Sequence, residues 1–224
     1  MSGKRTWLRR GLMSALYAGA LAAALSARAG EAAPGAAPSI FGTTEVRSTQ
    51  LQSLPKWTGV LDRYADERTV PDGPCDATFF TRCHLQDWKA LLRDLQGKDR
   101  MTQIEAVNKH LNEVSYLTDP VNYGVPDYWA TPRQFLTRRG DCEDYAIAKY
   151  MSLRSLGFSD DQMRVVVLND LNLRIAHAIL VVYHDGRALV LDNQIRSVVA
   201  ATSIRHYKPI FSVNETALWI HRAP

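Results

Sequence analysis

The chain has 224 residues, of which 46% are hydrophobic, and a formal net charge of +4. The excess positive charge lies at the N-terminus, because residues 1–29 carry five basic side chains and no acidic one. Without them the formal charge falls to about −1, which excludes the basic surface typical of nucleic-acid-binding proteins. Roughly 195 residues then remain, enough for one well-buried domain.

The first 29 residues have the pattern of an export signal. A basic head over residues 4–10 precedes an apolar run, and Ala-Arg-Ala at positions 27–29 supplies the small residues that a signal peptidase needs. The run is about 15 residues, shorter than the roughly 20 of a membrane-spanning helix. We therefore expect a signal peptide cleaved near Ala29 and a periplasmic protein, with an uncleaved anchor as the alternative. The arginine pair within the basic head leaves both Sec and twin-arginine export open.

The next segment, residues 30–50, is rich in Ala, Pro, Gly, Ser and Thr. This composition predicts a flexible lead-in, so that the folded domain spans residues 51–224. Apolar residues at helical spacing follow in residues 57–64, 85–95 and 104–114. These stripes predict helices that face a hydrophobic core.

After Gly157 the hydrophobic period changes from helical to alternating. Strands are predicted over residues 164–170, 174–184 and 187–194, and another pair within residues 206–222. Asp185-Gly186 has the composition of a two-residue hairpin turn. Helices followed by an antiparallel sheet predict an α+β fold.

Three cysteines suit an oxidising compartment. Cys75 and Cys83 are close enough in sequence to bridge a short loop, and two free buried thiols are the alternative. A Cys75–Cys83 disulfide would leave Cys142 as the free thiol. Cys142 is then either a reactive thiol or a small apolar residue of the core.

Cys142 stands at the predicted start of a helix, between three acidic residues that should raise its pKa. In one interpretation Asp141 is the N-cap and Asp144, three residues on, closes a capping box. In the other, Asp141 and Glu143 bind Ca²⁺, a hard cation that prefers carboxylate oxygens. Alternation around Cys142 would then point these two side chains away from the catalytic face.

The register of the predicted hairpin brings a histidine and an aspartate together. If Asp185-Gly186 forms a type I′ turn, paired residue numbers sum to 371, and His177 and Asp192 become diagonal neighbours on one face of the sheet. Such an aspartate would fix the tautomer and orientation of a general-base histidine. The predicted catalytic residues are therefore Cys142, His177 and Asp192. A bulge in the hairpin would place His177 and Asp192 on opposite faces.

Several motifs resemble the bacterial transglutaminase-like cysteine proteinases. They are "YWATPRQFL", "GDCEDYAIAKY", the His-Ala pair at 177–178 and "LVLDNQ", and the similarity covers most of the chain from about Trp57 onward. The resemblance implies a papain-like or transglutaminase-like core, in which the nucleophile begins a helix packed on an antiparallel sheet. In this core Cys142 would be the nucleophile, His177 the general base and Asp192 its orienting residue.

The resemblance also implies a calcium-dependent periplasmic protease that cuts a large surface adhesin near its N-terminus and so controls biofilm attachment. Asp141 and Glu143 would bind the Ca²⁺, with Asp144 and Asp127 as additional ligands. An inner-membrane cyclic-di-GMP receptor would sequester the enzyme. The residues alone leave open a transglutaminase-like acyl transferase, a cell-wall peptide hydrolase and an inactive binding module.

An acyl-transfer reaction at Cys142 requires donors for the oxyanion. The backbone N–H of Cys142 itself is one expected donor. Trp129 and Gln134 are candidates for the second, and the sequence does not choose between them.

Overall fold

The computed structural model describes residues 38–75 and 83–223, so the predicted signal peptide lies outside the described residues. Within these ranges no helix combines the length and the apolar character needed to cross a membrane. Cys75 and Cys83 form a disulfide, and Cys142 is a free thiol, as expected.

The N-terminal half of the described chain is helical. Its α-helices are α1 (Pro55–Glu67), α2 (His84–Asp94), α3 (Arg100–Leu111), α4 (Asp119–Asn122), α5 (Pro132–Arg138) and α6 (Cys142–Ser155). The three predicted apolar stripes correspond to α1, α2 and α3. Their inward-facing side chains, such as Trp57, Trp88 and Ile104, are buried in one hydrophobic cluster.

The strands form one antiparallel sheet. They are β1 (Thr44–Ser48), β2 (Met163–Asp170), β3 (Ile175–His184), β4 (Arg187–Leu191), β5 (Val199–Ala200), β6 (Tyr207–Val213) and β7 (Leu218–Arg222). Their order in the sheet is β1-β7-β6-β2-β3-β4-β5. Four short 3₁₀ turns complete the described elements: η1 (Ile40–Gly42), η2 (Leu51–Ser53), η3 (Asp160–Gln162) and η4 (Ala201–Ser203). The α+β class predicted from the sequence is confirmed.

The β3–β4 hairpin has the predicted register. Asp185 and Gly186 both have positive φ, 48° and 69°, as a type I′ turn requires. The paired residues run from His184 opposite Arg187 to Leu180 opposite Leu191, so their numbers sum to 371. No bulge interrupts this ladder, which ends at Leu180 and Leu191. His177 and Asp192 lie just beyond its end and meet through their side chains, as the register predicts.

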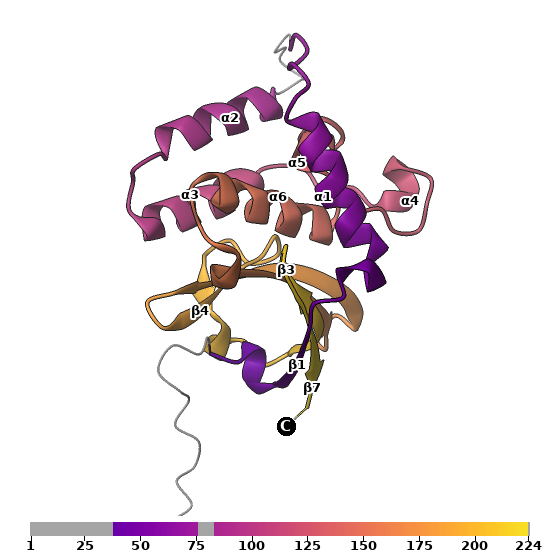
Figure 1. Cartoon of the computed structure of the whole chain (residues 1–224), viewed down its shortest axis with the longest axis vertical. Helices are drawn as coiled ribbons and strands as arrows, with labels where there is room; N and C mark the ends of the chain where they lie inside the picture. Colours follow the sequence, from indigo (N-terminus) through magenta and orange to yellow (C-terminus); the bar gives the residue numbers. More distant parts are fainter. Residues whose placement is uncertain (1–37, 76–82, 224) are drawn as a thin grey trace, which may run out of the picture. The chain divides into compact units, whose positions relative to one another are not determined.

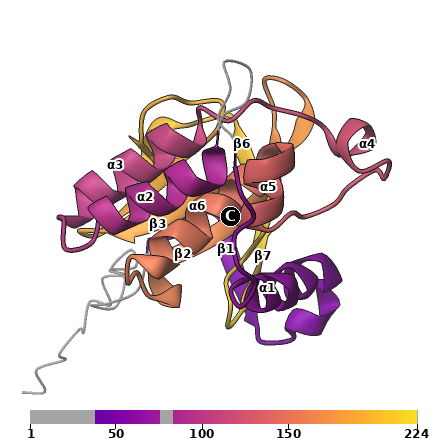
Figure 2. The same ribbon diagram turned by 90° about the horizontal axis from the view of Figure 1, so that it is seen from above.

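Helix α6 joins the helical layer to the sheet. It packs against β3 and β2 on one side and against α3 and α5 on the other. Figure 1 shows the helices on one side of the sheet, and Figure 2 shows α3 running alongside α6. Because α6 is covered on both sides, its side chains from Glu143 to Leu153 are all buried.

A second, smaller hydrophobic cluster covers the other face of the sheet. It contains Val166, Ile179, Val181 and Val190 from the central strands and Ile40 from η1. Tyr207 of β6 belongs to this cluster. The sheet therefore has apolar side chains on both faces, which explains the near-continuous apolar run of β3.

The structure differs from the predicted boundary at residue 51. Part of the expected flexible lead-in belongs to the fold, because β1 pairs with β7 from Thr44 opposite Arg222 to Ser48 opposite Leu218. Ile40, just before this strand, is fully buried. The short strand was missed because its own residues alternate only weakly and its stability comes from pairing with the far end of the chain.

Candidate active site

The thiol of Cys142 lies at the first residue of α6. Asp141 is the N-cap residue and forms the predicted capping box with Asp144, so the helix begins at the cysteine. Gly140 makes this arrangement possible, because a Cβ there would lie 2.1 Å from Oδ2 of Asp144. The sequence Gly-Asp-Cys-Glu-Asp thus places a free thiol at a helix N-terminus, beside free N–H groups and the positive end of the helix dipole.

His177 and Asp192 form a buried pair. Nε2 of His177 lies 3.0 Å from Oδ1 of Asp192, and the two residues are 2% and 0% exposed. The contact uses the ring nitrogen far from the backbone. Nδ1 is therefore the ring nitrogen left for proton transfer, with the side-chain nitrogen of Gln194 3.4 Å from it. The structure brings together the two residues that the hairpin register predicted.

The carboxylate of Asp192 is held from several directions. The backbone N–H of Gln194 donates to Oδ1 at 2.8 Å, and the hydroxyl of Tyr207 donates to Oδ2 at 2.6 Å. The side chain of Asn112 donates to the backbone oxygen of Asp192 at 2.8 Å. Burial by itself would raise the pKa of Asp192, but His177, the Tyr207 hydroxyl and the Gln194 N–H hold it below its usual value. The carboxylate is thus kept ionised and fixed in position.

Cys142 and His177 line one cleft of about 600 Å³. The walls include Trp129, Asp141 and Glu143, whereas Asp192 lies behind His177 and does not reach the cleft. An open cleft that contains a thiol and an imidazole suits attack on a bound acyl group.

The acidic residues beside Cys142 face the cleft rather than away from it. Oε2 of Glu143 lies 3.3 Å from Sγ of Cys142, and the expectation that alternation turns this side chain away is wrong. Successive residues in the first turn of a helix are about 100° apart, not 180°. Burial, followed by the charges of Glu143 and Asp141, raises the pKa of the Cys142 thiol, and a hydrogen bond from the Ala178 N–H opposes this rise.

Two further carboxylates complete an acidic cluster beside the cleft. Carboxylate oxygens of Asp119, Asp127 and Glu143 lie within 4.8 Å of one another, and Asp141 is within the same distance of Asp119 and Asp144. Asp127 is among the ligands predicted from the sequence, whereas Asp119 is not. Asp119 is brought to the cluster by a bridge between Tyr116 and Gly140. The only sequence signal is an aspartate before a proline, which is ordinary at the start of a short helix.

The cluster has the properties of a cation site. Oδ1 of Asp119 and Oδ1 of Asp141 are buried, and neither has a hydrogen-bond partner among the described residues. Burial and the neighbouring charges of Asp141 and Asp127 raise the pKa of Asp119, and burial and Asp141 raise that of Glu143 to about 10. Oxygen donors of this kind fit a hard cation such as Ca²⁺, whose charge would offset their repulsion.

Asp144, also predicted as a metal ligand, differs from the other acids. Its Oδ1 accepts a hydrogen bond from the Ala130 N–H at 2.7 Å, and its Oδ2 accepts one from the Asp141 N–H at 3.3 Å. Both oxygens thus hold the backbone around the start of α6. Asp144 supports the cluster mainly by fixing Asp141.

The two candidates for the second oxyanion donor are distinguished by their positions. Gln134 forms a capping box at the start of α5, with its Oε1 3.0 Å from the Thr131 nitrogen, and its Nε2 donates to the Tyr128 hydroxyl. It does not line the cleft, whereas Trp129 does. The structure therefore favours Trp129 over Gln134.

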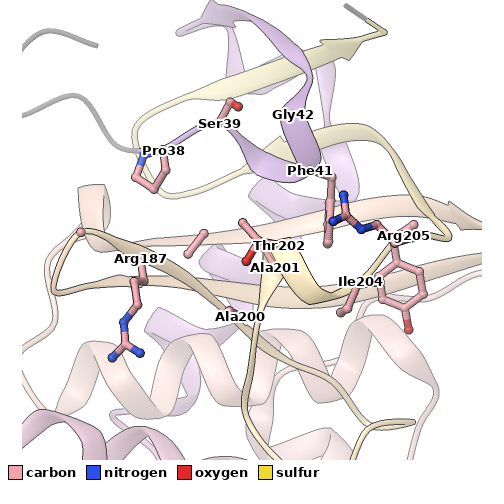
Figure 3. Close-up of a pocket in the computed structure, with 13 residues that line it drawn as sticks. Pro38, Ser39, Phe41, Gly42, Arg187, Ala200, Ala201, Thr202, Ile204 and Arg205 are labelled. Carbon is pink, nitrogen blue, oxygen red and sulfur yellow. The ribbon is translucent and has the colours of Figure 1, made fainter. Parts of the chain in front are cut away.

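A second pocket, of about 570 Å³, is lined by residues of η1, η4 and the start of β4. Figure 3 shows Arg187 and Arg205 at opposite ends of this pocket, with Phe41 beside Arg205. Its lining, which falls within the described residues, has no cysteine, histidine or carboxylate. None of the predicted catalytic or metal-binding residues lines this second pocket.

Comparison with known proteins identifies the family. The sequence model of one protein family, the bacterial transglutaminase-like cysteine proteinases, matches residues 77–222 of this chain. Legionella pneumophila LapG is 31% identical, with 72% of this chain and 87% of that chain covered and a TM-score of 0.57. The calcium-bound and EGTA-treated structures of Legionella pneumophila LapG are each 30% identical, with coverage of 73% and 86% and a TM-score of 0.58. The curated proteins include no match. The chain belongs to the bacterial transglutaminase-like cysteine proteinase family.

Proposed function

We propose that this protein is a calcium-dependent periplasmic cysteine endopeptidase. Cys142 is the nucleophile, His177 the general base and Asp192 the residue that orients His177. The observation that carries the proposal is the buried His177–Asp192 pair, whose imidazole opens on the same cleft as the thiol of Cys142. A thiol, a base and an orienting carboxylate are the parts that thiol-dependent acyl transfer requires.

The first half of the reaction forms an acyl-enzyme. His177 takes the proton of Cys142, and the thiolate attacks the carbonyl carbon of a peptide bond to give a tetrahedral intermediate. The Cys142 backbone N–H and the Trp129 indole N–H stabilise its oxyanion. The carbon–nitrogen bond then breaks, and the imidazolium of His177 gives its proton to the leaving amine. The product is a thioester on Cys142.

The second half releases the acyl group. His177 takes a proton from water, the resulting hydroxide attacks the thioester, and the thiolate of Cys142 leaves. The new carboxyl group departs with the N-terminal product. Asp192 keeps Nε2 of His177 protonated throughout, so that Nδ1 is the nitrogen that exchanges protons.

The Ca²⁺ would be held by the carboxylates of Asp119, Asp127, Asp141 and Glu143. Asp144 would fix the backbone at the start of α6, where its oxygens accept hydrogen bonds. The bound ion would supply positive charge beside the Cys142 thiol, whose pKa is raised by burial and then by the charges of Glu143 and Asp141. The proposal is supported by the partnerless buried oxygens of Asp119 and Asp141 and by the calcium-bound form of the related Legionella pneumophila LapG.

The proposed substrate is the N-terminal region of a large surface adhesin, whose release would control biofilm attachment, with a cyclic-di-GMP receptor of the inner membrane as the inhibitor. Export to the periplasm is supported by the Cys75–Cys83 disulfide, because such bonds persist in oxidising compartments.

Incubating the purified protein with an adhesin N-terminal fragment tests this function. The wild type should cut the fragment in calcium and not in a chelator, and Cys142→Ala should be inactive in both. An added primary amine distinguishes the acyl-transferase alternative, because that enzyme would attach the amine to the acyl group. Absence of any cut by the wild type in calcium would overturn the proposal for this substrate.

A further inference from the structure

A line of apolar side chains crosses the sheet from the cleft to its edge strand β1. Its five members are paired in turn on the neighbouring strands β3, β2, β6, β7 and β1, and they are Ala178, Val167, Phe211, Ile220 and Val46. Residues directly opposite each other on neighbouring strands have their side chains on the same face of a sheet. The five residues, here called the apolar row, therefore form one continuous apolar line.

The inner end of the apolar row belongs to the candidate active site. Ala178, Val167 and Phe211 all line the cleft that contains Cys142. The Ala178 N–H also donates a hydrogen bond to the sulfur of Cys142, so the row begins at the thiol itself. Val167 and Phe211 pack against the hydrophobic cluster of the helices, which places the row on the helix-bearing face of the sheet.

The outer end of the apolar row is exposed. Ile220 is 41% exposed and Val46 is 45% exposed, and neither residue lines the cleft. The open part of an antiparallel sheet usually carries polar side chains, whereas here two β-branched apolar residues stand side by side on adjacent strands. A polypeptide laid over them would remove this apolar surface from water, which favours binding.

Basic side chains flank the apolar row on the same face. Arg222 stands two residues from Ile220 in β7. Lys208 of β6 lies opposite Asn169 of β2, which stands two residues from Val167. Because side chains alternate between the two faces of a strand, both basic residues share the face of the row, and both are exposed. A bound chain with acidic residues beside its apolar ones would complement these charges.

We propose that the apolar row is an extended substrate-binding surface of the cysteine proteinase, which takes an apolar segment of the substrate with acidic residues beside it. The occupant is the substrate because the row is continuous with the cleft, and a polypeptide cut within its length leaves the cleft on both sides of the scissile bond. The inference rests on the proposed function. It adds a source of specificity that lies away from the reacting bond.

The spacing of the strands sets which substrate residues reach the outer end of the row. Neighbouring strands lie roughly 4.8 Å apart, so Ile220 is about 14 Å from Ala178 across the sheet and Val46 about 19 Å. An extended chain advances roughly 3.3 Å per residue. The substrate residues that contact Ile220 and Val46 are therefore about four to six positions from the scissile bond.

Substrates of different length test this assignment. The double variant Val46→Thr/Ile220→Thr replaces both exposed side chains by β-branched polar ones that suit a strand. KM for the adhesin N-terminal fragment should rise about five- to tenfold with kcat little changed, because the lost contact binds the ground state and the transition state equally. For a peptide with two residues on each side of the cut, the double variant and the wild type should have the same KM, because such a peptide does not reach the row.

Two series of longer peptides locate the contact and test the charges. One series extends the short peptide by six residues before the cut, and the other extends it by six residues after the cut. The double variant should raise KM for one series only. In that series, replacing acidic residues of the extension by lysine should raise KM of the wild type, because Arg222 and Lys208 would face like charges.

Two further variants control for unspecific effects and for misfolding. Val70→Thr makes the same chemical change at a valine that is 53% exposed and belongs neither to the row nor to the cleft lining. It should leave KM unchanged for every substrate. Arg222→Glu reverses a charge on an exposed side chain and should raise KM for the adhesin fragment alone, so the inference is still tested if the double variant does not fold.

The outcomes are distinguishable. Unchanged KM for the adhesin fragment in the folded double variant, or an equal rise for short and long substrates, would overturn the inference. A wild type that is dimeric in size-exclusion chromatography, beside a monomeric double variant, would assign the row to a second copy of this chain and overturn it as well. Failure of the wild type to cleave either the fragment or the short peptide would instead overturn the proposed function.

Discussion

Nε2 of His177 lies 3.0 Å from Oδ1 of Asp192, and both side chains are almost completely buried. This contact fixes which ring nitrogen carries the proton, and it leaves Nδ1 as the nitrogen available to the cleft. A neutral amide in place of the carboxylate would keep the shape of the pair but remove its charge.

Asp192→Asn should therefore lower kcat by roughly 10²–10⁴-fold, because the amide neither enforces the tautomer nor stabilises the imidazolium. The measurement is steady-state cleavage of the adhesin fragment in calcium, together with circular dichroism to establish that the variant is folded. Wild-type kcat in a folded Asp192→Asn protein would exclude Asp192 as the orienting residue.

Tyr207→Phe should lower kcat/KM by about fivefold, since the variant loses the 2.6 Å hydrogen bond to Oδ2 of Asp192, worth about 1 kcal/mol. Tyr183→Phe is a matched control in the same hydrophobic cluster, because its buried hydroxyl has no hydrogen-bond partner among the described residues. Equal activities of the two variants would show that the Tyr207 hydroxyl does not support Asp192.

Removing any one of three carboxylates of the acidic cluster should abolish or strongly weaken calcium binding, measured by isothermal titration calorimetry. Calcium-dependent cleavage should fall in parallel. The variants are Asp119→Asn, Asp141→Ala and Glu143→Ala. In a chelator, Asp119→Asn should melt at a higher temperature than the wild type, because like charges no longer repel. In calcium the order should reverse, because the wild type alone gains the free energy of binding.

Asp161→Asn, at an exposed acid of η3, is the control for the calcium site and should behave as the wild type. If Asp141→Ala and Glu143→Ala both keep full, chelator-resistant activity, the acids only cap the helix.

Lys149→Met should stabilise the folded protein most below pH 7. In the unfolded chain Lys149 stays protonated up to about pH 10.5, whereas in the folded chain it stays protonated only up to about pH 7. The wild type therefore gains stability as pH rises between these values, and the advantage of the variant shrinks over the same range. The largest difference in the free energy of unfolding between Lys149→Met and the wild type is on the order of 4 kcal/mol. Urea unfolding of both proteins at pH 6.5 and at pH 9.5 measures it. A difference independent of pH would contradict a buried, titrating Lys149.

His221 should make the fold sensitive to acid. Its ring nitrogens contact the hydroxyls of Thr43, at 2.7 Å, and Ser212, at 2.8 Å, and burial lowers its pKa below 6.5. The unfolded state then binds the proton first, so the stability contributed by the neutral ring is complete above pH 6.5 and is lost as pH falls below it. His221→Gln should lose less stability than the wild type between pH 7 and pH 5 in urea unfolding.

Short-range patterns in the sequence determined much of the candidate site. The capping residues Asp141 and Asp144 place Cys142 at the start of a helix, because the box satisfies the first free N–H groups of that helix. The Asp185-Gly186 turn sets the hairpin register, and the pleat then places His177 beside Asp192. Each of these relationships depends on residues close together in the chain or on one hairpin.

The tertiary structure decided what no local pattern contains. Asp119 reaches Asp141 because a bridge joins segments some twenty residues apart, Glu143 turns into the cleft, and β1 is stabilised by the opposite end of the chain. Lys149 looks like an ordinary helical lysine until α6 is enclosed between α3 and the sheet. Burial and charge proximity depend on how distant segments pack, and for that reason the acidic cluster and the buried cation became visible only in the folded protein.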